Sequence, residues 1–160
     1  TPLGGLRIAV NGERIHRFTA DDRPIAADQD WGPEFVGVYP YMDLEYFIDG
    51  IMDILEEPAD PRHRREFHLC ECGGFWFVFD RLDETYVRLA VRGSSVVPTS
   101  QRGYLVTVEK LSSEAVAALD RIILEVDEKE GTDSNKSEKM RDFRDSAVSD
   151  LEKHVTLSYK

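Results

Sequence analysis

The stretch 43–57 constrains the fold most, because its apolar residues recur at the spacing of an α-helix. At about 100° per residue they occupy one broad arc, which requires an apolar surface to pack against. The arc consists of Leu44, Phe47, Ile48, Ile51, Met52, Ile54 and Leu55. The opposite side has no lysine or arginine and gathers Glu45, Tyr46, Asp49, Asp53, Glu56 and Glu57, with Gly50 at the border. The stretch therefore predicts a helix with one core-facing side and one acidic side.

Short alternating segments before and after this helix predict a mostly antiparallel sheet. Asn11-Gly12 separates two such segments and is the dipeptide preferred in the type I′ turn of a β-hairpin. Gly73-Gly74 separates two further strand candidates, of which the second is apolar on both faces. A strand of that kind is expected at the centre of a sheet that is covered on both sides. The strands are expected at 6–10, 13–18, 67–72, 75–80, 86–92 and 104–109.

Two more amphipathic stretches predict helices at 112–126 and 137–154. Their apolar stripes are Val116, Leu119, Ile123 and Val126 in the first and Met140, Phe143, Ala147 and Leu151 in the second. The last helix is expected to dock on the sheet or to pair with another chain. Polar composition predicts a mobile linker at 127–139, and the segments 19–40 and 93–103 are expected to be loops.

These elements predict an α+β fold with a mostly antiparallel sheet of about five to six strands. Helices at about 43–57, 112–126 and 137–154 would pack on that sheet. The chain has 160 residues, of which 41% are hydrophobic, and this is enough for one domain, 1–160, with a single core.

The net charge of −11 is concentrated in one part of the chain. The segment 25–61 holds ten acidic residues and no Lys, Arg or His, whereas the rest of the chain holds 20 basic and 21 acidic residues. Such a field repels nucleic acid and anionic membranes and attracts a basic protein partner. Arg62, Arg64 and Arg65 follow the acidic helix directly, so where they point decides whether its acids face a partner or are balanced within the chain.

Cysteine usage and hydropathy favour a cytoplasmic protein. Cys70 and Cys72 are one residue apart, which is too close in a strand for a comfortable disulfide. No stretch reaches the ~18 apolar residues of a spanning helix, and no signal-peptide pattern opens the sequence. The chain begins at Thr1 without a methionine, so the native N-terminus stays open.

Catalytic and cofactor motifs are missing from the sequence. It contains no Gly-rich phosphate loop, no HExxH and no GxSxG, so no catalytic residue and no cofactor is predicted. His68, Cys70 and Cys72 alternate along a predicted strand and would present a nitrogen and two sulfurs on one face, a set that zinc accepts. Because a structural zinc site needs four ligands and no second pair is present, buried free thiols are the favoured interpretation.

In size, charge and layout, chiefly over residues 25–92, the chain resembles the immunity proteins of bacterial toxin systems. The resemblance implies a protein that binds a basic toxin, in some cases a nuclease, and occludes its active site or a neighbouring exosite. Carboxylates would then replace the phosphates that the toxin contacts. We expect complementarity from Glu45, Asp49, Asp53, Glu56 and Glu57, and an apolar anchor from Tyr46 and Trp31.

Two other classes of function stay open. A small hydrolase or transferase would use a carboxylate site in the loop region 21–41, built from Asp28, Asp30 and Glu34. It would show a deep cavity with converging polar groups. A structural or regulatory subunit would dimerise through the C-terminal helix.

Overall fold

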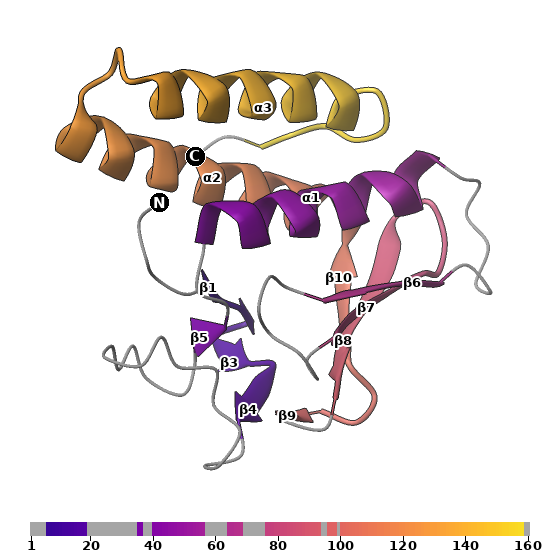
Figure 1. Ribbon diagram of the computed structural model, residues 1–160. Coiled ribbons are helices and arrows are strands. Elements are labelled where there is room, and N and C mark those ends of the chain that lie inside the picture. The colour runs from indigo at the N-terminus through magenta and orange to yellow at the C-terminus, as the bar shows by residue number, and fades with distance from the viewer. Residues whose placement is uncertain are drawn as a thin grey trace.

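The computed structural model describes residues 6–18, 35–36, 40–56, 64–68, 76–93, 96–98 and 100–158. Within these residues the fold is α+β, as predicted, with three helices and a four-stranded antiparallel sheet (Figure 1). The helices lie on one side of the sheet, where α1 and α2 contact the strands and α3 covers α1 and α2, and short paired strands lie beside the sheet. The α+β prediction is therefore confirmed.

Helix α1 spans Pro40–Glu56 and begins three residues earlier than predicted. Pro40 marked the end of a loop in the sequence, but a proline at the first helical position costs no hydrogen bond, because that N–H has no partner inside the helix. Asp43 consequently lies within the first turn and is fully buried.

The main sheet has the order β10-β8-β7-β6, with every neighbouring pair antiparallel. Its strands are β6 (Arg64–His68), β7 (Trp76–Arg81), β8 (Tyr86–Arg92) and β10 (Tyr104–Thr107). Strand β7 is central, and its residues Phe77, Val78 and Phe79 are all buried, as its doubly apolar pattern predicts. Strand β8 alternates buried and more exposed residues, so one of its faces is turned toward solvent.

The other strands form two-stranded pairs instead of extending the main sheet. Strand β2 (Ala9–Val10) pairs with β3 (Glu13–Arg14) around Asn11-Gly12, whose positive φ angles of 52° and 80° fit the predicted type I′ turn. Pairing also joins β1 (Leu6–Arg7) to β5 (Phe35–Val36) and β4 (His16–Phe18) to β9 (Val96–Pro98). Strands β5 and β9 lie in segments that were predicted to be loops. Each is only two or three residues long, which is too short to show an alternating pattern.

Helices α2 (Val108–Glu130) and α3 (Asn135–Leu151) are longer or earlier than predicted and leave only 131–134 between them. Most of the predicted linker 127–139 is therefore helical. Some of its charges are paired within the chain: Asp127 lies 2.5 Å from Arg141 of α3, and Lys136 lies 2.6 Å from Glu130. Thr107 and Ser134 cap the two helices by accepting hydrogen bonds from backbone N–H groups.

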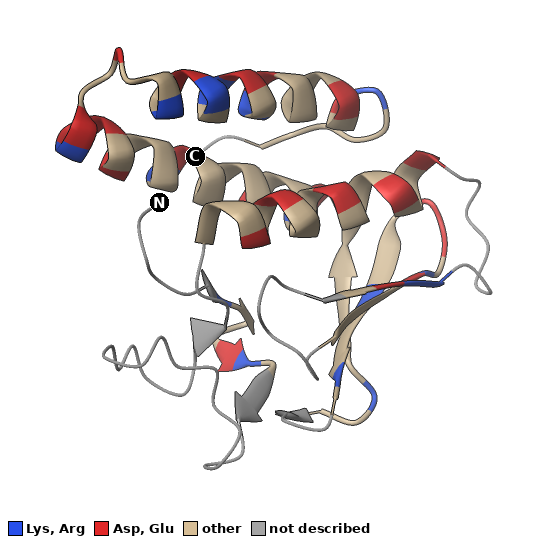
Figure 2. Ribbon diagram, in the orientation of Figure 1, with Lys and Arg blue, Asp and Glu red and all other residues tan. Residues whose placement is uncertain are grey.

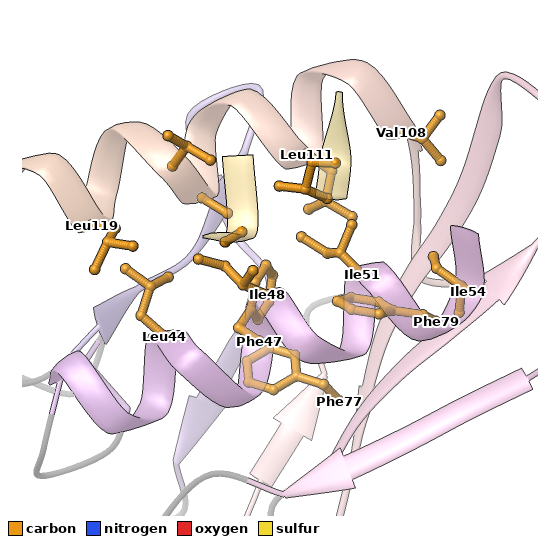
Figure 3. Packing of buried hydrophobic residues seen from close by; sticks show 14 of the residues in the cluster. Leu44, Phe47, Ile48, Ile51, Ile54, Phe77, Phe79, Val108, Leu111 and Leu119 are labelled. Atoms are coloured by element: carbon orange, nitrogen blue, oxygen red, sulfur yellow. The ribbon is translucent and has the colours of Figure 1, made fainter. Parts of the chain in front are cut away.

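One hydrophobic core joins the three helices to the main sheet. Figure 3 shows Phe47, Ile48 and Ile51 of α1 between Phe77 and Phe79 of β7 and Leu111 of α2. Helix α3 covers α2 and α1 and buries Met140, Ala147 and Leu151, so its predicted apolar stripe packs within the chain. Phe143 adds an edge-on contact with Tyr41, with ring centroids 6.2 Å apart. The stripe that suggested dimerisation is thus already covered by the chain's own helices.

Candidate functional site

The acidic side of α1 holds together most of the residues predicted to bind a partner. Glu45, Asp49, Asp53 and Glu56 recur at the spacing that lines one side of a helix. Asp49, Asp53 and Glu56 are exposed, Glu45 is partly buried, and Tyr46 beside them is 45% exposed. We call these four acids and Tyr46 the acidic face. Figure 2 shows its acidic positions as red bands along α1, a helix whose sequence contains no lysine or arginine.

Within the acidic face, Glu45 and Asp49 are in surroundings that oppose their charge. Burial raises the pKa of Glu45, a hydrogen bond from the Tyr41 hydroxyl lowers it, and the charge of Asp49 raises it again, so the net shift is upward. Burial also raises the pKa of Asp49, and the charge of Asp53 adds to this. Adjacent acids at i and i+4 destabilise a helix by a few tenths of a kcal/mol per pair. The charges of this face therefore work against the stability of α1.

The arginines that follow α1 leave this face largely uncompensated among the described residues. Arg64 turns to the other face of the sheet, where its Nε lies 2.7 Å from Oδ1 of Asp80. Arg65 approaches the acidic face, but its Nε lies 3.9 Å from Oδ2 of Asp53 and both side chains are substantially exposed. An exposed pair at that distance contributes little. Arg62 lies outside the described residues.

Gly50 lies on the side of α1 that packs against the sheet, not on the acidic face. It is buried, and a Cβ at this position would lie 2.7 Å from Cε1 of Phe67 on β6. Because the Phe67 ring is held among Phe47, Phe77 and Phe79, the missing side chain is what lets α1 approach the sheet. Its place at the border of the apolar arc is therefore explained by packing.

On the face of the sheet opposite α1, the basic residues are balanced by acids. Asp80, with a side chain only 8% exposed, accepts hydrogen bonds from Arg64 and from Nε of Arg88 at 2.7 Å. Glu66 accepts from Arg92, whose guanidinium also lies 5.1 Å from the ring centre of Trp76. Burial alone would raise the pKa of Asp80, but the hydrogen bonds and charges of the two arginines lower it below its usual range. This network holds the sheet together and offers little free positive charge.

Arg81 is a structurally important residue that the sequence analysis missed. It is only 4% exposed, and its guanidinium donates to the carbonyl of Ile54 at 3.0 Å and to the carbonyl of Asp83 at 2.7 Å. A third donor reaches Oε2 of Glu84 at 3.0 Å. A cation at the C-terminal end of α1 interacts favourably with the helix dipole, whereas the acids in the last turn interact unfavourably with it. The sequence could have indicated this role, because the arginine lies two positions after Phe79 and therefore on the same buried face of the central strand.

Several predicted residues fall outside the part of the chain that the structure describes. These are Trp31, Glu57, Cys70, Cys72 and the carboxylates Asp28, Asp30 and Glu34 of the enzymatic alternative. The backbone of His68 belongs to β6, but its side chain is not described. Among the described residues, no group of three or more His, Cys, Asp or Glu side chains is arranged to hold a metal ion.

No protein-family model, curated protein or solved structure matches this chain. None of the described helices combines the length and apolar character needed to cross a bilayer. The candidate site therefore rests on the geometry of α1 alone.

Proposed function

We propose that this chain is an acidic protein-binding module that uses the acidic face of α1 to bind a basic protein. The class that fits best is an immunity protein, which neutralises a toxin by covering its active site or an exosite. The observation that carries the proposal is the set of acids on α1, which destabilise their own helix and have little cationic compensation among the described residues. A basic partner would supply the missing compensation.

Tyr46 supports binding to a protein in preference to simple solvation. It is 45% exposed, lies within the acidic face and makes a large side chain available where the surrounding residues are charged. Tyrosine is enriched among the residues that dominate binding energy at protein interfaces, because it buries a rigid ring and keeps a hydrogen-bonding hydroxyl. The face thus combines charge for attraction with one anchor for affinity.

The experiment compares two double charge reversals on different helices. In one, Asp49 and Asp53 of the acidic face become lysine; in the control, Glu138 and Asp142 of α3 become lysine. Both pairs are exposed acids four residues apart, so the change in net charge is the same. Each purified protein is immobilised and exposed to an extract of the source cell at low and high salt, and bound proteins are identified by mass spectrometry.

The proposal predicts a basic protein that binds the wild type and the α3 control at low salt and is released at high salt. The Asp49→Lys, Asp53→Lys variant should raise the Kd for that protein by about a hundredfold. If the captured protein is an enzyme, one equivalent of the wild-type chain should inhibit it. Equal binding by both variants would contradict the assignment of the acidic face.

A further inference from the structure

A cavity of about 560 Å³ lies away from the acidic face, between the N-terminal strands, the inner side of α1, strand β10 and helix α2. Its walls are mainly apolar and include Ile8, Val10, Leu44, Phe47 and Ala118. This volume is within the range of cavities that bind small molecules. The apolar walls exclude a strongly polar ligand as occupant, because burying unpaired polar groups is costly.

Basic side chains line this cavity in a molecule whose net charge is −11. Arg7, Lys110 and Arg121 all line it and are all exposed. Lys110 is paired at 2.7 Å with Glu114, which also lines the cavity, so among the described lining residues the excess charge comes from the two arginines. Neither Arg7 nor Arg121 is paired with a carboxylate of the described residues, unlike Arg64, Arg81, Arg88, Arg92, Arg141 and Arg144.

We propose that this cavity binds a small amphipathic anion, with its hydrocarbon part against the apolar walls and its headgroup at Arg7 and Arg121. Guanidinium groups present a planar set of donors that matches carboxylate, sulfate or phosphate oxygens. The apolar walls contribute affinity through the area they remove from water. The two arginines select against neutral and cationic molecules that have the same hydrocarbon part. This site is separate from the acidic face, so the outcome of its test does not depend on the proposed protein-binding function.

The direct test uses decanoate as probe, below its micelle-forming concentration, with decanol and decyltrimethylammonium as neutral and cationic counterparts. Backbone amide NMR shifts of the full chain report where each molecule binds. The proposal predicts saturable binding of one decanoate, with a Kd below about 1 mM. The shifts should concentrate at residues 105–107 and 110–118. Decanol should bind at least about tenfold more weakly, because it lacks the charge-assisted hydrogen bonds. Equal binding of the three molecules, or no saturable binding, would overturn the proposal.

Two variants separate the arginines from the apolar walls. Replacing both Arg7 and Arg121 with glutamine should weaken decanoate binding about tenfold and leave decanol binding unchanged. The matched control is Arg102→Gln, an exposed arginine that does not line the cavity. Ala118→Phe should fill the cavity and abolish binding of both molecules, while an unchanged circular dichroism spectrum shows that the chain is folded. Decanoate binding that survives in both variants would refute the site.

Discussion

A side chain at position 50 would collide with Phe67, so the approach of α1 to β6 depends on the absence of a Cβ there. Arg81 acts at the other end of the same contact, because its guanidinium holds the carbonyl of Ile54 in the last turn of α1. A buried guanidinium is tolerated only when its donors are satisfied, and three of them have partners here. These two residues place the acidic face by fixing the helix that carries it.

Replacing Gly50 with alanine should destabilise the protein, although alanine is the better helix former. The substitution gains about 1 kcal/mol of helix propensity, but overpacking against Phe67 typically costs about 1–3 kcal/mol. Neighbouring rings restrict the movement of Phe67, since its centroid lies 5.1 Å from that of Phe79 and 5.5 Å from that of Phe77. Urea unfolding measures the net effect.

The paired variant Phe67→Leu supplies the control for this prediction. In that background the ring is gone, so Gly50→Ala should become stabilising by about 1 kcal/mol. An identical effect of Gly50→Ala in both backgrounds would show that Phe67 does not limit the approach of α1.

At the level of the helix, α1 combines a buried apolar side with an acidic side whose like charges repel one another. Its apolar residues Ile48, Ile51 and Ile54 are completely buried, whereas Asp49 has Glu45 and Asp53 as neighbours at i−4 and i+4. An exposed helix under selection for stability alone would have lysine or arginine at some of these positions. The arrangement is that of a surface whose charge is used in binding.

Asp49→Asn should therefore stabilise the free protein and weaken binding of the basic partner. Removing one charge relieves two like-charge contacts, which is worth a few tenths of a kcal/mol at pH 7. The control is Glu125→Gln on α2, where the neighbours at i−4 and i+4 are Arg121 and Lys129, so the same type of change should destabilise slightly. Urea midpoints at low salt measure both effects. Loss of stability in Asp49→Asn would mean that an intramolecular cation pairs with Asp49.

Periodicity predicted those elements whose pattern extends over several turns or alternations. The apolar arc of α1 and the doubly apolar β7 were found because burial alone dictates them. The helical ends at 127–130 and 135–139 were missed because ion pairs between the two helices stabilise them, and Arg141 and Asp127, for example, are 14 positions apart. The direction in which Arg64 and Arg65 point was equally unpredictable, since it depends on the pairing of β6 with β7.

Among the described residues, the acids with shifted pKa values fall into two groups, which respond to pH in opposite ways. Asp80 is paired with Arg64 and Arg88, and its pKa is below the ordinary value of 3.8. Glu45 and Asp49 on α1 have pKa values raised above their ordinary values of 4.5 and 3.8. Asp80 therefore stabilises the fold when it is charged, whereas Glu45 and Asp49 oppose the fold when they are charged.

These signs define a pH window. The contribution of Asp80 is complete above about pH 5 and is lost as the pH falls through 3.8 and then through its lower folded pKa. The penalty from Glu45 and Asp49 is present at neutral pH and disappears as they become protonated, at pH values above their ordinary pKa values. Wild-type stability should therefore change little or rise slightly from pH 7 to 5 and fall below pH 4.

Asp80→Asn tests whether protonation of Asp80 causes the loss of stability at low pH. The variant is less stable at pH 7, because Arg64 and Arg88 lose their charged partner, but it should lose less stability than the wild type between pH 5 and pH 3. Asp49→Asn should lack the part of the relief that the wild type gains as Asp49 becomes protonated above pH 3.8, and should otherwise follow the wild type. Urea midpoints at pH 7, 5 and 3 distinguish the three proteins. Parallel curves for the wild type and Asp80→Asn would show that other carboxylates control the acid limit of the fold.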